Sequence, residues 1–151
     1  IRLDALVSHE REKHMSALSI AASDVLGDGS VYETLPAGEV IAAGEACYKS
    51  GGTWLLGECD ASTTVNTKSV VSGVALNSAL IAGQPVKVQK KGTVTVGGTV
   101  VVGKRYVLDG AAGKICPEDD LATNDWVTTI GHGATSTTIK LAIDATLIKF
   151  A

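Results

Sequence analysis

The residues best suited to chemistry in this chain are three histidines, three cysteines and one acidic stretch, and their spacing assembles no reaction centre. His9 and His14 lie in a charged N-terminal segment, and His132 lies between Gly131 and Gly133. Histidine can act as a general base near neutral pH, but it needs a nucleophile or carboxylate at a defined position. No serine, cysteine or carboxylate has a known spacing to His132, so we interpret it as a surface or strand-end residue.

Cys47, Cys59 and Cys116 follow no metal-binding pattern, because none belongs to a Cys-x-x-Cys pair and no histidine stands at ligand spacing. An odd number of cysteines without an apolar leader core predicts free, buried thiols in a protein made in a reducing cytosol. One alternative stays open: Cys47 and Cys59 flank a predicted hairpin and could face each other as a disulfide.

The acidic stretch at residues 117–125 lacks the alternating oxygen ligands and central glycine of a calcium loop. We expect a polar surface loop with a helical turn. Gly97-Gly98 is no phosphate cradle, because no helix with Lys-Ser or Lys-Thr follows it. The sequence therefore predicts no enzyme: no catalytic residue, no cofactor and no metal.

Composition narrows the class of protein further. The chain has 151 residues, 45% of them hydrophobic, with 17 glycines and few aromatic residues, so its core must be built from small aliphatic side chains. A net charge of -3 gives no basic field to hold nucleic acid. No apolar run approaches the roughly 20 residues of a membrane-spanning helix. We expect partners that are neither nucleic acid nor membrane.

A hairpin signature recurs three times, each copy running from a glycine through a β-prone strand to a glycine-containing turn and a second strand. Glycine supplies the positive φ of such turns, and Val, Tyr and Thr suit a pleated, half-buried surface. The three copies are residues 44–54, 83–94 and 103–115. They predict an all-β fold: a compact sandwich or small barrel of short antiparallel strands with hairpin repeats, preceded by an N-terminal arm or short helix.

Period-two alternation assigns the faces of these strands. Val86 and Val88 should face the core, and Lys87 and Gln89 should face water. Ile139, Leu141 and Ile143 should be buried in the same way near the C-terminus. The predicted strands are residues 39–42, 46–49, 53–59, 69–77, 85–89, 93–96, 99–102, 105–108, 114–117, 126–132 and 137–143.

The chain divides into an N-terminal arm, residues 1–24, and a β-rich body, residues 25–151. The body reads as two related modules, residues 25–80 and 81–151. Gly44 to Gly73 and Gly103 to Gly131 each span a hairpin, a polar connection and a strand that ends in glycine, and the two separations differ by one residue.

The arm has two possible structures. An extended arm would order only against a partner, whereas a helix is favoured locally because Glu10 and His14 stand four residues apart without an intervening glycine or proline. The residues expected at an interface with a partner or a second subunit are apolar and lie near the chain ends: Leu3, Leu6, Val7, Leu18 and Phe150. We expect Leu147, Ile148 and Phe150 to anchor the chain end against the body or a neighbouring subunit.

The C-terminal half resembles a known family. The motifs are Gly83-Gln84-Pro85-Val86, Gly103-Lys104-Arg105-Tyr106-Val107-Leu108, Gly113-Lys114-Ile115-Cys116-Pro117, residues 120–131 (Asp-Leu-Ala-Thr-Asn-Asp-Trp-Val-Thr-Thr-Ile-Gly) and residues 136–141 (Ser-Thr-Thr-Ile-Lys-Leu). Together they resemble the bacteriophage capsid decoration, or head cement, family. Asn124 stands where that family usually has glycine before Asp125.

The resemblance implies a structural virion protein that binds the outer surface of a phage capsid and stabilises the shell by bridging major capsid subunits. It implies the major capsid protein as partner, a homo-oligomer such as a trimer, synthesis in the host cytoplasm and a place on the capsid exterior. The alternative is a tail-fibre or baseplate-associated β module that binds a host receptor or glycan. Sugar sites usually stack an exposed aromatic on the ring, and Trp54 and Trp126 are both expected to be core anchors within strands.

Overall fold

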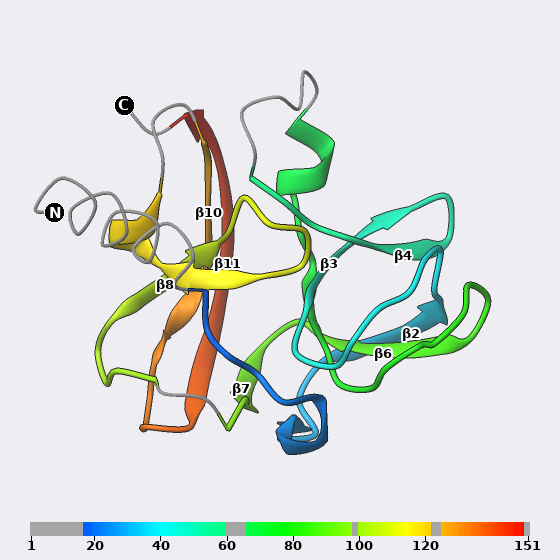
Figure 1. Cartoon of the computed structure of the whole chain (residues 1–151), viewed down its shortest axis with the longest axis horizontal. Coiled ribbons are helices and arrows are strands. Elements are labelled where there is room, and N and C mark those ends of the chain that lie inside the picture. Colours follow the sequence, from blue (N-terminus) through cyan, green and yellow to red (C-terminus); the bar gives the residue numbers. More distant parts are fainter. Residues whose placement is uncertain (1–16, 60–65, 98–99, 122–124, 150–151) are drawn as a thin grey trace, which may run out of the picture.

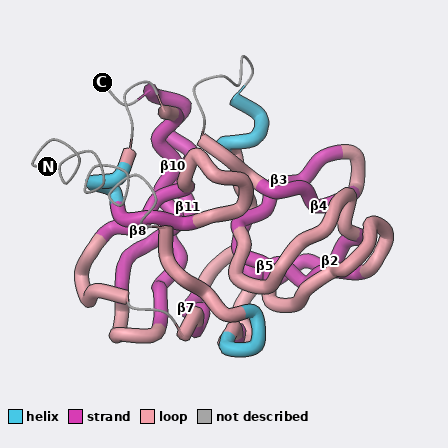
Figure 2. The backbone as a smooth tube through the Cα atoms, in the orientation of Figure 1, coloured by secondary structure: helices cyan, strands magenta, loops and turns pink. Residues whose placement is uncertain are grey.

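A computed structural model describes residues 17–59, 66–97, 100–121 and 125–149 (Figure 1). The fold is all-β, and two antiparallel sheets pack together as a sandwich, which confirms the predicted fold class. In Figure 2 the magenta strands form two groups, with β8, β10 and β11 in one and β2 to β5 in the other. Among the described residues, no helix is long and apolar enough to cross a membrane.

The six-stranded sheet has the order β1-β7-β11-β10-β8-β9. Its strands are β1 (Leu26–Gly27), β7 (Gly92–Thr95), β8 (Arg105–Leu108), β9 (Ile115–Pro117), β10 (Trp126–Gly133) and β11 (Thr138–Lys149). The five-stranded sheet has the order β2-β6-β5-β3-β4. Its strands are β2 (Tyr32–Pro36), β3 (Ala46–Ser50), β4 (Thr53–Leu56), β5 (Gly73–Ala75) and β6 (Pro85–Gln89). Three short 3-10 helices complete the described elements: η1 (Ala22–Asp24), η2 (Asn66–Ser69) and η3 (Glu118–Asp120).

Two of the three predicted hairpins are present and one is wrong. β3 pairs with β4 around Gly51 and Gly52, and β8 pairs with β9. β6 and β7 do not pair, because β6 belongs to the five-stranded sheet and β7 to the six-stranded sheet. The turn before Gly92, whose φ is +85°, carries the chain from one sheet to the other.

Several predicted strands also need correction. Residues 39–42 form a loop with a single bridge from Ile41 to Ala79, and the described part of 99–102 forms only a bridge at Val102. Glycines bound both segments, so the chain turns before a ladder can extend. The strands β1 and β2 were not predicted. Both are sheet edges, and β2 ends at a proline, which an edge tolerates.

The division between the sheets does not follow the predicted boundary at residue 80. β1, from the first predicted module, pairs with β7, and Leu26 lies opposite Thr95. β6, from the second, lies between β2 and β5. Each sheet therefore contains strands from both halves of the body.

The core has two apolar clusters. The larger one includes Tyr106, Leu108 and Ile130, and its members come from both sheets. The smaller one surrounds Trp54, which is fully buried as predicted. The predicted burial of Val86, Val88, Ile139 and Leu141 is confirmed, while Ile143 and Trp126 are half-buried at the margin of the larger cluster.

Gln89 was expected on the wet face of β6, and the structure places it in the interior with none of its surface exposed. Its side-chain nitrogen donates to the backbone oxygens of Lys91 (2.7 Å) and Thr93 (3.2 Å) and to Asp28 Oδ1 (3.0 Å). Its side-chain oxygen accepts from the Asp28 backbone N–H at 3.2 Å. A buried amide is stable only when its groups are bonded, and here the partners lie beside β1 and β7 of the opposite sheet.

Asp28 completes this junction. Its Oδ2 accepts from the Thr93 N–H at 2.7 Å, and its Oδ1 accepts from the Ser30 N–H at 2.9 Å. These hydrogen bonds to the charged form lower the pKa of Asp28 from 3.8 to about 2, the bond from Thr93 being the largest cause. We call Asp28, Gln89 and Thr93 the sheet junction.

Replacing Gln89 should destabilise the fold. In Gln89→Met the chain keeps a similar volume but loses the amide, so the part-buried hydrogen bonds to Asp28, Lys91 and Thr93 are lost at a cost of about 1–3 kcal/mol. Chemical denaturation would measure this loss. Gln84→Met is the matched control, because the Gln84 amide caps only the exposed Leu80 and Ile81 N–H groups and its loss should cost less. Equal losses of unfolding free energy in Gln89→Met and Gln84→Met would contradict a stabilising role for the sheet junction.

The junction should also make stability depend on pH. Because the folded pKa of Asp28 lies below its ordinary value, its contribution is complete above about pH 4 and is lost as pH falls through about 2. Asp28→Asn should therefore destabilise the protein at neutral pH and flatten the decline in the denaturation midpoint between about pH 5 and pH 2. Parallel pH profiles for the wild type and this variant would show that Asp28 is not the titrating group.

Candidate docking surfaces

The three cysteines are buried free thiols, so the predicted thiol state is the one present and the alternative Cys47–Cys59 disulfide is not formed. Cys47 packs in the Trp54 cluster and Cys59 in the larger cluster. Burial, as the largest cause, raises the pKa of each thiol well above its ordinary value. A thiol of this kind is a poor nucleophile at neutral pH.

Cys59 and Cys116 approach a half-buried carboxylate. Burial raises the pKa of Asp109, and the bonds from Gly110 and Cys116 act against that rise. The negative charge of Asp109 in turn raises the pKa of both thiols. Within the described ranges, no group of three or more His, Cys, Asp or Glu side chains could hold a metal ion. We interpret this cluster as packing beneath β8 and β9.

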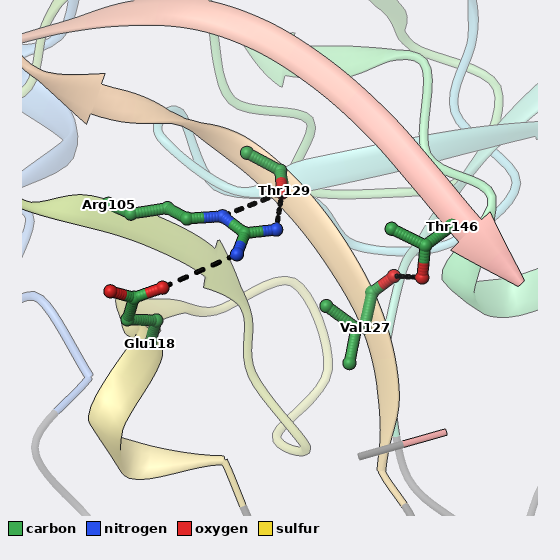
Figure 3. A network of polar contacts seen from close by, with 5 residues as sticks. All are labelled: Arg105, Glu118, Val127, Thr129 and Thr146. Atoms are coloured by element: carbon green, nitrogen blue, oxygen red, sulfur yellow. Dashed lines mark hydrogen bonds and ion pairs between the residues drawn. The ribbon is translucent and has the colours of Figure 1, made fainter. Parts of the chain in front are cut away.

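The predicted acidic loop folds into η3, which is tied to β8 by ion pairs. Lys104 Nζ lies 3.1 Å from Asp119 Oδ2, and Arg105 Nη1 lies 3.3 Å from Glu118 Oε2. The Arg105 guanidinium also donates to Thr129 Oγ1 on β10 (Figure 3). Exposed ion pairs contribute about 0–1 kcal/mol each, so the ion pairs of Lys104 and Arg105 position η3 more than they stabilise the body.

A separate hydrogen bond joins β11 to β10 on the same sheet. The Thr146 hydroxyl donates to the Val127 carbonyl at 2.7 Å.

His132 is exposed on β10, as predicted, and lies directly opposite Arg105 of β8 and Lys140 of β11. The three side chains share the outer face of the six-stranded sheet, because their neighbours Tyr106, Ile139 and Leu141 are buried. The row is basic, but Arg105 is already paired with Glu118. We assign it no chemistry.

Leu18, which was predicted to lie at an interface on the arm, packs on the body instead. The Leu18 N–H donates to the Ile115 carbonyl at 2.8 Å, along the outer edge of β9, and Leu18 and Ile20 pack against the larger core cluster. The predicted arm therefore ends before Leu18 rather than at residue 24. Leu3, Leu6, Val7 and Phe150 lie outside the described residues. Ile148, expected to be an anchor, is 64% exposed in this chain.

Two adjacent valines stand out beside the point where residues 1–16 join the body. Val101 and Val102 are 54% and 66% exposed, although the chain holds both in place. The Val101 N–H donates to the Tyr106 hydroxyl at 2.9 Å, and Val102 bridges to Gly133. We call Val101 and Val102 the valine rim. Val101 lines a groove of about 330 Å³ together with Ala17, Leu18, Tyr106 and Pro117.

A second apolar surface lies on the loops that flank the Ile41–Ala79 bridge. Val40, Leu80 and Ile81 are 60%, 76% and 65% exposed. Gln84 Oε1 accepts from the Leu80 N–H at 2.6 Å and the Ile81 N–H at 3.3 Å, so the loop is held while its side chains face solvent. We call these three residues the apolar tip.

Sequence reasoning missed both surfaces. Its only signal was a pair of aliphatic residues next to a glycine turn, as in Val101-Val102-Gly103, and that pattern also describes a buried strand. It missed Tyr32 as well, which is 49% exposed at the start of β2.

The comparisons with known proteins add no assignment. The sequence matches no protein-family model and is similar to none of the curated proteins at a significant level. The surfaces above are therefore the features from which a function can be argued.

The position of Leu18 yields a test of where the arm ends. Leu18→Ala should destabilise the body by about 1–2 kcal/mol, because part of a buried leucine's transfer free energy is lost. Val102→Ala is the matched control, and as a surface change it should stay within about 0.5 kcal/mol. Thermal denaturation would compare them. Equal thermal stability of the two variants would contradict the packing of Leu18 on the body and would mean that the arm includes Leu18.

Proposed function

We propose that this chain is a structural virion protein that binds the outer surface of a phage capsid and stabilises the shell by bridging major capsid subunits. The observation that carries the proposal is the valine rim beside the start of the described chain at Ala17. The rim adds exposed apolar surface to the place where residues 1–16, with Leu3, Leu6 and Val7, join the body. The family resemblance of residues 83–141 supports the same function.

The physics of the rim suits a docking role. Exposed aliphatic side chains that are held in place lose little entropy on binding, since the backbone around them is already ordered. Full burial of one valine side chain contributes at most about 1.5–3 kcal/mol, so a single rim binds weakly. A homo-oligomer, which we propose to be a trimer, would present several rims at once and gain affinity through effective concentration.

A sandwich body also suits this role, because cementing requires a stiff connection between subunits and no catalytic residue, cofactor or metal. We propose that the partner is the major capsid protein, rather than nucleic acid or a membrane. The chain would be made in the host cytoplasm and placed on the capsid exterior.

The alternative function is a tail-fibre or baseplate-associated module that binds a host receptor or glycan. Tyr32 favours it, because its ring is 49% exposed and lines a hollow next to Leu26 and Lys87, and an exposed aromatic ring is a common platform for a sugar. The capsid assignment is preferred because the valine rim and the resemblance both support it. The two functions predict different positions for the chain on the virion.

Capsid attachment should depend on the valine rim. Bare capsids of the phage that carries the gene should co-sediment with the wild-type chain, and electron microscopy should show added density on their outer surface. Val101→Glu with Val102→Glu should abolish attachment while leaving circular dichroism unchanged, because two carboxylates would be desolvated at the interface. Val70→Glu, at a valine 44% exposed elsewhere, is the matched control and should still attach.

Deletion of residues 1–16 should weaken attachment and keep the cooperative thermal transition, since the Leu18–Ile115 bond remains. Wild-type chain that leaves bare capsids undecorated, or localises to tails, would contradict the proposed function. Equal attachment of the double valine variant would contradict the proposed surface.

A further inference from the structure

A shallow hollow lies between the edge strands β1 and β2, at one end of the sandwich. Its volume is about 230 Å³, and its walls include Leu26, Tyr32, Leu76 and Lys87. Leu26 is 68% exposed and Tyr32 is 49% exposed, so both rise from the rim toward solvent. The hollow thus combines aliphatic walls, one aromatic ring and one cation.

The cation lies on the ring and has no carboxylate partner among the described ion pairs. Lys87 Nζ stands 3.9 Å from the centre of the Tyr32 ring. The nearby Glu33 carboxylate is already shared by Lys49 at 2.9 Å and Lys90 at 2.7 Å. A cation over an aromatic face gains only about 0.5–1 kcal/mol at an exposed site, so Lys87 can still bind an anion.

The backbone around the hollow is fixed by hydrogen bonds. The Lys87 N–H donates to Asn77 Oδ1 at 2.7 Å, and Tyr32 pairs with Gln89 across β2 and β6. The sheet junction of Asp28, Gln89 and Thr93 lies next to it, and Gln89 is also part of the lining. A preformed site costs a ligand little ordering entropy.

We propose that this hollow binds a single saccharide ring that carries a carboxylate, of the uronic acid class. The apolar C–H face of the sugar would take the place of Lys87 on the Tyr32 ring and pack against Leu26, and Lys87, moved off the ring, would donate a charge-assisted hydrogen bond to the carboxylate. The size fits one ring, because the volume is below the roughly 300–1,000 Å³ of sites for larger ligands. The inference goes beyond the capsid proposal and does not depend on it.

The test uses two sugars that differ only at C6. Methyl β-D-glucuronide carries the carboxylate and methyl β-D-glucoside does not, and each would be titrated into the full chain while backbone amide signals are followed by NMR. The glucuronide should shift the amides of Leu26, Tyr32 and Lys87 saturably and bind about tenfold more tightly than the glucoside, as expected for one charge-assisted hydrogen bond.

Variants separate the two contacts. Lys87→Gln should remove the tenfold preference for the acid, Lys87→Arg should retain it, and Tyr32→Ala should weaken binding of both sugars. Lys114→Gln, which removes an exposed lysine from the ion pair with Glu45, is the matched control and should change nothing.

Three results with the two sugars would overturn the proposal. They are no saturable shift with glucuronide, equal affinity for the two sugars, and an unchanged preference in Lys87→Gln. Tighter saturable binding of the capped dipeptide acetyl-Leu-Asp-methylamide at the same amides would also overturn it, because the hollow would then fit a protein partner. None of these results depends on whether the chain attaches to capsids.

Discussion

The arrangement of the two sheets depends on how one buried glutamine is satisfied. Gln89 ends β6 in one sheet, and within three residues the chain begins β7 in the other. The Gln89 amide bonds to both sides of this crossing and to Asp28, whose carboxylate bonds to Thr93. Gly92 is required at the same place, because a Cβ there would lie 2.4 Å from Ser30 Oγ and 2.6 Å from Asp28 Oδ2. The turns at residues 28–30 and 90–92 are thus held together by the buried Gln89 amide and the exposed Asp28 carboxylate.

The crossing of the chain from β6 to β7 also determines where the hollow with Tyr32 and Lys87 forms. It brings the edge strands β1 and β2 next to each other, and the hollow with Tyr32 and Lys87 lies between them. At β9, a different edge, the backbone of Leu18 bonds to Ile115 and leaves the valine rim exposed beside Ala17. The proposed capsid surface and the proposed sugar site are therefore separate, since they lie on different sheet edges. Neither needs a catalytic group.

Local patterns in the sequence predicted the all-β class, the hairpins β3–β4 and β8–β9, and the buried faces of β6 and β11. These features follow from glycine turns and period-two alternation, which act over a few residues. The crossing at Gly92 could not be predicted, because a turn between two strands has the same local pattern whether the strands pair or separate. Gln89 was wrongly predicted to face water. Alternation shows which face of β6 carries Gln89, but it does not show that polar groups of Asp28, Lys91 and Thr93 cover that face and bond to the amide. Leu18 was assigned to the arm and the valine rim was missed, because the Leu18–Ile115 bond and the Val102–Gly133 bridge join residues that are far apart in the sequence.

The most direct test of this account is a double-mutant cycle between Asp28 and Gln89, measured by chemical denaturation at neutral pH. Gln89 Nε2 donates to Asp28 Oδ1, so the account predicts non-additive losses: Asp28→Asn should cost less stability in the Gln89→Met background than in the wild type, while the Asp28 bonds from Thr93 and Ser30 still contribute in both. Purely additive losses would contradict it, because they would mean that the two residues stabilise their own sheets independently and that the sheet junction does not exist as a unit.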